Sequence, residues 1–255
     1  MRRRSDDDDE TMMDLVVDIG NTLQKVAVFS EKGVLLDLFS EKNLSITFLE
    51  NLFRQYSIGR AVVSSVRKDD ESVLHWLEGK TQLLRFSAAC RLPIRLKYAT
   101  PETLGTDRIA NAVGANALYP NRNVLSLMAG TCLVADFVNE KGEYLGGSIA
   151  PGVRMRFQAL SEFTARLPKV EPENIGFFVG DSTENSILSG VMNGIIQEIE
   201  GIIRQYSRHY DHLKVILSGG DAELLQNSIK KRIFAAQNPI LVGLHKILIL
   251  NASKR

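Results

Sequence analysis

The sequence has few cysteines, no excess of charge of either sign and no long apolar run. Its two cysteines, Cys90 and Cys132, are too few for a disulfide framework and indicate a reducing, cytoplasmic compartment. The 31 basic and 30 acidic residues give a net charge of +1, so no overall field favours nucleic acid or a membrane surface as a partner. No apolar stretch approaches the length that crosses a bilayer. The composition therefore favours a protein that acts on a small molecule.

Two common nucleotide-binding motifs are also missing. No complete Gly-x-x-x-x-Gly-Lys-Ser/Thr P-loop occurs, and no Gly-x-Gly-x-x-Gly follows a strand-like run. A P-loop kinase and a Rossmann dehydrogenase are therefore disfavoured. With 255 residues, 44% of them hydrophobic, the chain can still bury one large core or two modest ones.

The N-terminal segment, residues 1–12, is expected to be a disordered tail. It begins with a short basic run, and residues 6–10 are all acidic. No apolar segment follows the basic run, so the segment is not a secretory signal. An acidic run of this kind repels itself and stays solvated.

Short apolar, β-branched runs recur along the rest of the chain and predict strands. The expected strands are at residues 15–19, 25–30, 33–39, 61–66, 83–86, 124–128, 133–138, 144–149 and 213–217. Helices are expected at residues 46–56, 71–79 and 101–118. Tyr119-Pro120 breaks the last of these helices, and we expect the N-terminal domain (13–120) to end there and the C-terminal domain (121–255) to begin. This alternation predicts an α/β protein in two halves, each with a mixed sheet.

The segment from Asp18 to Thr22 separates two strand-like runs and is followed by Lys25, a pattern typical of a β-hairpin. Gly20 lets the backbone approach an anion, while Asn21 and Thr22 supply hydrogen-bond donors. Lys25 adds positive charge, and Asp18 can hold Mg²⁺ directly or through water. An ordinary hairpin with a capped turn explains these residues about equally well when they are taken alone.

The second half repeats this pattern. Gly130-Thr131 lies between two expected strands, and Gly219-Gly220 ends another strand and opens a helix, where a nucleotide could lie against the backbone. Each glycine pair is weak evidence by itself, but three such turns in this order are stronger. Two phosphate-binding hairpins, one in each half, would face each other across a cleft.

Together these motifs resemble those of the type III pantothenate kinases. The matching motifs run in order from about Asp14 to the C-terminus: Asp18-x-Gly20-Asn21-Thr22-x-x-Lys25, Gly105-Thr106-Asp107-Arg108, Gly130-Thr131, Gly146-Gly147-Ser148-Ile149-Ala150-Pro151-Gly152, Leu167-Pro168 and Gly219-Gly220-Asp221. The resemblance implies the two-domain, actin-like (ribonuclease H-like) ATPase fold with mixed sheets. It also implies ATP- and Mg²⁺-dependent phosphorylation of pantothenate to 4'-phosphopantothenate, the first step of coenzyme A synthesis.

The resemblance assigns roles to the matching residues. It makes Asp107 the catalytic base and places Arg108 at the substrate, whose carboxylate a guanidinium can bind through two parallel hydrogen bonds. Tyr98 and Thr183 are implied to contact pantothenate, together with the Gly105-Thr106 backbone. From local physics alone, Tyr98 is equally well explained as a core residue, and Thr183 as the N-cap of the helix that follows.

One position departs from the family pattern. The family usually has an aspartate that serves an activating monovalent cation (K⁺ or NH₄⁺) where this chain has Met128, and often a threonine where it has Val134. A thioether is a poor ligand for a hard cation. We therefore expect weak or absent K⁺ activation, or a lower turnover. Asp136 is available as a further Mg²⁺ or water ligand.

The helix after Thr183 has an apolar stripe at helical spacing. The stripe is formed by Ile187, Val191, Ile195, Ile199, Ile202 and Tyr206, and small residues occur four apart at Ser186, Gly190 and Gly194. Burial within one chain explains the stripe. In the family, this region helps to form a homodimer with the active site near the interface, so we expect a homodimer for this chain.

Two other functions fit part of the pattern. A nucleotide-binding accessory or regulatory protein of the same fold, with weak or no kinase activity, is favoured by Met128 and disfavoured by the presence of Asp107 and Arg108. Another small-molecule kinase on this fold would keep the phosphate turns. It should lack the combined set of Tyr98, Gly105-x-Asp107-Arg108 and Thr183.

Overall fold

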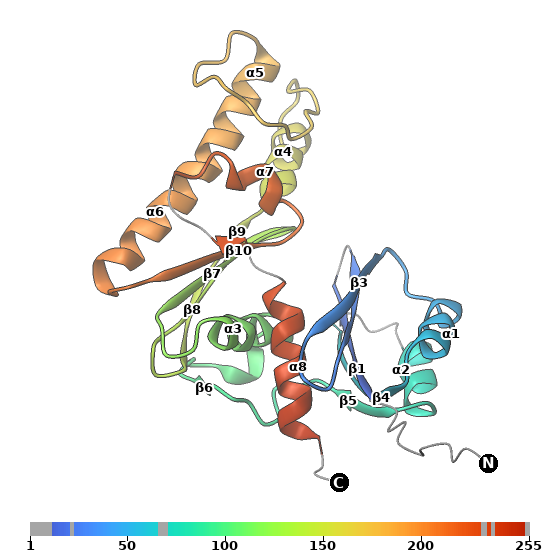
Figure 1. Cartoon of the computed structure of the whole chain (residues 1–255). Coiled ribbons are helices and arrows are strands. Elements are labelled where there is room, and N and C mark those ends of the chain that lie inside the picture. Colours follow the sequence, from blue (N-terminus) through green and yellow to red (C-terminus); the bar gives the residue numbers. More distant parts are fainter. Residues whose placement is uncertain (1–11, 21–22, 66–70, 231–233, 236–237, 253–255) are drawn as a thin grey trace, which may run out of the picture. The chain divides into compact units, whose positions relative to one another are not determined.

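The computed structural model describes residues 12–20, 23–65, 71–230, 234–235 and 238–252 (Figure 1). The chain forms two compact units. The first contains Met1–Arg91, Gly105–Asp107 and Leu244–Arg255, and the second contains Leu92–Leu104 and Arg108–Gly243. The tail expected at the N-terminus lies almost wholly outside the described residues.

The first unit is built on a five-stranded mixed sheet in the order β3-β2-β1-β4-β5. Its elements are β1 (Met13–Ile19), β2 (Gln24–Phe29), β3 (Leu35–Glu41), α1 (Ile46–Gln55), β4 (Ile58–Ser65), α2 (Glu71–Glu78) and β5 (Gln82–Arg85). Alternate residues of β1 (Leu15, Val17 and Ile19) are fully buried in one core with Leu49 of α1 and Leu77 of α2. The two helices thus cover one face of this sheet.

The second unit is built on a six-stranded mixed sheet in the order β11-β10-β7-β8-β9-β6. Its elements are β6 (Arg95–Leu96), η1 (Pro101–Thr103), α3 (Thr106–Leu118), β7 (Val124–Ala129), β8 (Cys132–Val138), β9 (Glu143–Pro151), α4 (Val153–Glu162), α5 (Thr183–Leu188), the π-helical segment η2 (Ser189–Asn193), α6 (Gly194–His209), β10 (Lys214–Ser218), α7 (Ala222–Gln226), β11 (Phe234–Ala235) and α8 (Pro239–Asn251). The apolar stripe of the long helix is buried within this unit, where Ile195 and Ile199 are fully covered. α3 and α8 each have residues in both units.

The two sheets repeat one pattern of strand pairing. With β6 set aside, the second sheet reads β9-β8-β7-β10-β11 and matches β3-β2-β1-β4-β5 of the first. In each sheet the first two pairs in this order are antiparallel and the last two are parallel. The prediction of an α/β protein in two halves, each with a mixed sheet, is confirmed.

The helix expected over residues 101–118 is interrupted. A 3₁₀ turn over Pro101–Thr103 is followed by Leu104 in an extended conformation, and α3 begins only at Thr106. The structure therefore places Asp107 in the first turn of a helix. A carboxylate is favoured there by the positive end of the helix dipole.

The division into units also differs from the boundary expected after residue 120. The turn at Tyr119-Pro120 lies inside the second unit because most of α3 packs there. Asn111 accepts a hydrogen bond from Ser126 of β7, and a Cβ on Gly114 would lie 1.8 Å from the carbonyl oxygen of Pro239. The break at Pro120 thus ends a helix but not a domain.

Two expectations from composition can be compared with the structure. Within the described ranges, no helix is long and apolar enough to span a membrane. Cys90 and Cys132 are both free cysteines in the structure.

Candidate active site

The first unit brings Asp18, Lys25 and Asp107 into electrostatic contact. Asp18, near the end of β1, is paired in register with Lys25 on β2 and with Ser64 on β4. Burial raises the pKa of Asp18 to about 6, while Lys25 lowers it and the negative charge of Asp107 raises it. Burial in turn lowers the pKa of Lys25, against the attraction of Asp18. Two carboxylates and one ammonium group thus share one partly buried site.

The residues around this site are small and polar. Ser64 is buried and donates a hydrogen bond of 3.3 Å to the hydroxyl of Thr106, the residue before Asp107. The backbone N–H of Gly20 donates to the carbonyl of Leu23, as a hairpin turn requires. Asn21 and Thr22, which are predicted to donate hydrogen bonds to phosphate, stand between Gly20 and Leu23 in the sequence and lie outside the described residues.

In the second unit, three backbone turns meet at the carboxyl end of β7. A Cβ on Gly152 would lie 2.0 Å from the carbonyl oxygen of Gly130, and one on Gly219 would lie 2.2 Å from that of Ala129. Gly219 has φ +104°, which glycine adopts readily. Beyond it, Asp221 donates its N–H to Ala129. Glycine therefore permits the close packing of the turns that carry Gly130-Thr131 and Gly219-Gly220.

A Cβ would meet no atom within 4 Å at either Gly130 or Gly220. The backbone at these two positions is accordingly not covered on the Cβ side by any part of the chain that the structure describes. The N–H of Gly130 donates to the carbonyl oxygen of Cys132, so what these glycines offer an anion is close approach to the backbone. The prediction that β10 ends at Gly219-Gly220 and a helix follows is confirmed by β10 and α7.

Arg108 and Asp136 form a buried ion pair in the second unit. Nε and Nη2 of Arg108 both donate to Oδ1 of Asp136, at 2.9 and 2.8 Å. Tyr144 donates its hydroxyl proton to the same oxygen at 2.8 Å, and Asn111 donates to Oδ2 at 3.0 Å. Asp136 is 1% exposed and Arg108 is 7% exposed. This arrangement directs Asp136 toward hydrogen-bond donors rather than toward a metal ion.

Tyr98, the aromatic residue matched to a pantothenate contact, lies beside this ion pair. The guanidinium of Arg108 lies 5.8 Å from the ring centre of Tyr98 and 6.0 Å from that of Tyr144. Gly146, with φ +100°, admits the ring of Tyr98, because a Cβ there would lie 3.3 Å from two ring carbons. Two residues matched to pantothenate contacts, Tyr98 and Arg108, are therefore neighbours within one unit.

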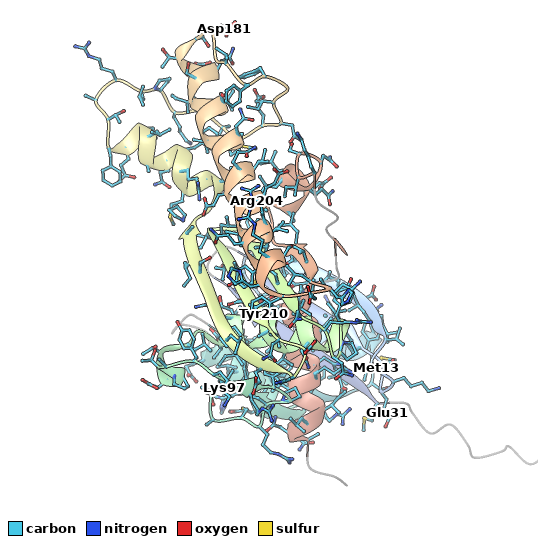
Figure 2. All side chains as sticks on the ribbon, turned by 90° about the vertical axis from the view of Figure 1, so that its left-hand side faces the viewer. Met13, Glu31, Lys97, Asp181, Arg204 and Tyr210 are labelled. Atoms are coloured by element: carbon cyan, nitrogen blue, oxygen red, sulfur yellow. The ribbon has the colours of Figure 1, made fainter. Side chains whose placement is uncertain are left out.

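The structure does not bring Thr183 to these residues within one chain. Thr183 is exposed in the first turn of α5, two residues after Asp181. Asp181 lies at the opposite end of the second unit from Lys97, the neighbour of Tyr98 (Figure 2). The N-cap of α5 is Ser182, whose hydroxyl accepts from the N–H of Asn185, so the N-cap role considered for Thr183 is wrong.

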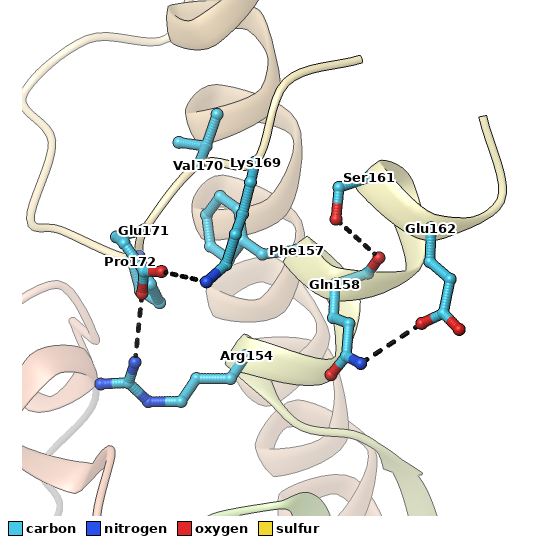
Figure 3. A pocket seen from close by; sticks show the side chains of 9 residues that line it. All are labelled: Arg154, Phe157, Gln158, Ser161, Glu162, Lys169, Val170, Glu171 and Pro172. Carbon is cyan, nitrogen blue, oxygen red and sulfur yellow. Dashed lines mark hydrogen bonds and ion pairs between the residues drawn. The ribbon is translucent and has the colours of Figure 1, made fainter. Parts of the chain in front are cut away.

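A groove of about 540 Å³ lies between α4 and the segment that follows it, and no sequence motif predicts it. Figure 3 shows Arg154 of α4 and Lys169 both paired with Glu171, over an apolar floor that includes Phe157. Arg154 also lies 3.9 Å from Asp221, which follows the Gly219-Gly220 turn. The groove thus adjoins one of the predicted nucleotide-binding turns.

Among the residues described, no three His, Cys, Asp or Glu side chains form a cluster that could hold a metal ion by themselves. A divalent cation at Asp18 would therefore need oxygen ligands from water or from a bound phosphate. Mg²⁺ commonly binds in this way, with one or two carboxylates and its remaining positions filled by water and substrate. Asp18 fits such a site.

Known proteins resemble this chain in sequence and in fold. The model of the type III pantothenate kinase family matches residues 14–205. A type III pantothenate kinase from Christiangramia forsetii is 42% identical over 244 residues, which are 95% of this chain and 100% of the relative. One from Cytophaga hutchinsonii is 42% identical over 242 residues, which are 94% of this chain and 100% of the relative.

A structural neighbour of this chain is a putative 2-dehydro-3-deoxygalactonokinase from Sinorhizobium meliloti. It has a TM-score of 0.56 and 14% identity and covers 91% of this chain and 97% of its own. The chain has the two-domain, actin-like fold with mixed sheets that these kinase structures share, which confirms the predicted fold class. More narrowly, the chain belongs to the type III pantothenate kinase family.

Proposed function

We propose that this protein transfers the γ-phosphoryl group of ATP to the primary hydroxyl of pantothenate, giving 4'-phosphopantothenate and ADP. The observation that carries this proposal is the electrostatic coupling of Asp107 to Asp18. In this proposal, the carboxylate matched to the family's base acts close to Asp18, which precedes the turn proposed to bind phosphate. Family membership supplies the substrate, and this site supplies the groups that its phosphorylation needs.

In the proposed reaction, the substrate hydroxyl oxygen forms a bond to the γ-phosphorus while the bond from that phosphorus to the bridging oxygen of ADP breaks. Asp107 accepts the hydroxyl proton as the transfer proceeds. Lys25 and the turns at Gly20 and Gly130-Thr131 stabilise the negative charge on the phosphates. The remainder of the nucleotide lies against the backbone at Gly219-Gly220.

Asp18 is the proposed magnesium ligand. Its carboxylate lies next to a phosphate-binding turn and carries a charge above about pH 6. Mg²⁺, when bound, neutralises phosphate charge. We do not propose Asp136 as a ligand, because both of its oxygens already accept hydrogen bonds.

The residues at the expected monovalent-cation position do not fit a hard cation. Met128 is paired in register with Val134 on β8 and with Ser218 on β10, so a thioether and an isopropyl group stand where a cation would need oxygen ligands. We propose that K⁺ or NH₄⁺ contributes little to turnover. The accessory-protein alternative is not favoured, because Asp18, Lys25 and Asp107 are all present and coupled.

An ADP-release assay with a coupled readout tests the proposed reaction. We expect ADP formation that depends on pantothenate, and a drop in kcat of about 10²- to 10⁴-fold in Asp107→Asn, because the amide cannot accept the proton. Glu102→Gln, a change at an exposed acidic residue of η1, is the matched control and should keep wild-type rates. Absence of pantothenate-dependent ADP in the wild type would refute the function. Full activity in Asp107→Asn would refute only the assignment of Asp107 as the catalytic base.

We also propose a cytoplasmic homodimer in which Thr183 reaches the partner's substrate. The separation of Asp181, two residues before Thr183, from Lys97, the neighbour of Tyr98, supports this arrangement (Figure 2). Large exposed apolar side chains nearby also support it, since Phe163, Phe178 and Val179 are each about 80% exposed. The free thiols of Cys90 and Cys132 are compatible with a reducing cytoplasm.

Mixing two inactive variants tests the dimer. Asp107→Asn and Thr183→Asp would each destroy both sites of their own homodimers, but a heterodimer would keep one intact site. Co-expression in equal amounts should restore about a quarter of wild-type activity, since half of the dimers are mixed and each has one working site of two. No recovery, or a monomer in sedimentation, would refute this arrangement.

A further inference from the structure

The carboxylate of Asp136 is the centre of a closed hydrogen-bond cluster in the second unit. It accepts two hydrogen bonds from Arg108, one from Tyr144 and one from Asn111. Asn111 accepts in turn from Ser126, which is opposite Asp136 in the strand register. A buried carboxylate is costly unless it is paired and fully hydrogen-bonded, and this one is both. Its contacts hold other side chains in place.

The geometry of the pair fixes the orientation of Arg108. Because Nε and Nη2 both donate to one oxygen of Asp136, the plane of the guanidinium cannot turn without losing both bonds. The rings of Tyr98 and Tyr144 lie near it, and Gly146 leaves room for the ring of Tyr98. The direction of the remaining nitrogen, Nη1, is thereby set as well.

The cluster joins the residues matched to pantothenate contacts to the sheet. Arg108 and Asn111 are three residues apart on α3, so both reach Asp136 on β8 from the same face of that helix. Asp136 therefore anchors the start of α3 through two side chains. No motif in the sequence identifies this role, because Asn111, Ser126 and Tyr144 stand outside the matched motifs.

We propose that Asp136 is a positioning residue for substrate binding: it orients the guanidinium of Arg108, with Tyr144 and Asn111 holding the carboxylate. This inference rests on the proposed function, in which Arg108 touches pantothenate. It predicts that loss of the Asp136 charge affects pantothenate binding more than it affects ATP binding or the phosphoryl-transfer step.

The test is steady-state kinetics with pantothenate and ATP varied separately. In Asp136→Asn we expect the KM for pantothenate to rise about tenfold, whereas kcat and the KM for ATP change less than about threefold. Tyr144→Phe, which removes one bond to Asp136 and leaves both bonds from Arg108, should give a smaller rise. A folded Asp136→Asn protein with the wild-type KM for pantothenate would overturn the inference.

A double-mutant cycle shows whether Asp136 acts through Arg108. In an Arg108→Met background, Asp136→Asn should raise the KM for pantothenate no further. Equal increases in both backgrounds would overturn the inference. If Asp136→Asn does not fold, Tyr144→Phe decides the matter: a raised KM supports the inference and an unchanged one overturns it.

Asp14→Asn is the matched control, because Asp14 is a buried carboxylate of the first unit held by Arg60 and His245. It should reduce stability and leave the KM for pantothenate unchanged. The assay also separates two failures. A wild type without pantothenate-dependent ADP release would overturn the proposed function and this inference with it. Normal wild-type turnover with unchanged KM in Asp136→Asn would overturn this inference alone.

Discussion

The two units share one strand pattern but bury their charges at different places in it. In the first unit, Val16 is opposite Ala27 in the β1–β2 pair, and two residues later Asp18 is opposite Lys25, next to the turn. In the second unit, Ser126 is opposite Asp136, and two residues later Met128 is opposite Val134. The charged residue of the strand pair therefore lies two residues farther from the turn in the second unit than in the first.

The two carboxylates, Asp18 and Asp136, differ in their surroundings, and we propose that this difference separates a reactive group from a positioning one. At the turn, the carboxylate of Asp18 is close to the charge of Asp107, and its pKa of about 6 lies within reach of physiological pH. Asp136 lies two residues farther from the turn of its own strand pair, and hydrogen-bond donors surround its carboxylate. In our proposals, the first unit uses the position next to the turn for chemistry, and the second unit uses the position two residues farther along for positioning.

Removing the charge of Asp18, next to the turn of the first unit, should have the largest effect on activity. We expect Asp18→Asn to lower kcat/KM for MgATP by about 10²- to 10³-fold, because charge stabilisation at the phosphates is lost. Steady-state rates at varied MgATP measure it. Met128→Leu, at the equivalent register position of the second unit, is the matched control and should change the rate little. Comparable losses in both variants would contradict the comparison.

The pH profile provides a second test of the same carboxylate. Because the pKa of Asp18 is raised to about 6, the group gains its proton as pH falls through that value, with Lys25 and Asp107 as its charged neighbours. Wild-type kcat/KM for MgATP should therefore fall below about pH 6. The ratio of wild type to Asp18→Asn isolates this effect, since the phosphates of ATP titrate equally in both assays. A ratio independent of pH would contradict the assignment.

The first unit also contains a buried carboxylate, Asp14, whose hydrogen-bond partners enclose it. A substitution at Asp14 tests a contribution to stability that is separate from catalysis. Burial alone would raise its pKa, but hydrogen bonds from His245 and Arg60 outweigh burial and lower it. We expect Asp14→Asn to lower the free energy of unfolding by about 3 kcal/mol, because buried partners lose their counter-charge. Urea denaturation near neutral pH measures the change.

The pH dependence of that stability has a definite sign. A lowered pKa means that the contribution of Asp14 is present above the unfolded value and is lost as pH falls through the folded one. The difference between wild type and Asp14→Asn should therefore shrink below about pH 4. A difference that grows in acid would show that these hydrogen bonds do not lower the pKa of Asp14.

The smallest expected effect concerns the turn of the second unit. K⁺ should change wild-type turnover less than about twofold, whereas Met128→Asp should gain a severalfold response, because a carboxylate supplies the oxygen that a thioether lacks. Rates in potassium salts compared with a bulky organic cation measure the difference. Equal stimulation of both proteins would contradict it.

Local patterns predict the strands and the turns well. The run before Asp18 and the turn at Gly219-Gly220 each have the expected structure, because β-branched alternation and glycine act over a few residues. The start of α3 is less predictable. Helical periodicity continues upstream through Pro101, and only the extended backbone at Leu104 shows that the helix begins at Thr106.

Contacts between distant segments cannot be predicted in the same way. From the sequence, Asp136 is available as a metal ligand. Nothing near it along the chain shows that its carboxylate binds Arg108, which lies 28 residues away. Domain membership is also hidden, since α3 and α8 each have residues in both units. Of the residues that the family resemblance assigns to the substrate, Tyr98 and Arg108 lie side by side, whereas Thr183 does not lie beside them within one chain.

Phosphorus NMR of a reaction containing the wild type, ATP, Mg²⁺ and pantothenate tests the central claim most directly. The proposed function predicts a new phosphomonoester signal that grows in equal amount with ADP, and that grows at least about 100-fold more slowly when Asp107→Asn replaces the wild type. Inorganic phosphate formed in place of the ester, or no conversion of pantothenate, would contradict the claim that this protein is a pantothenate kinase.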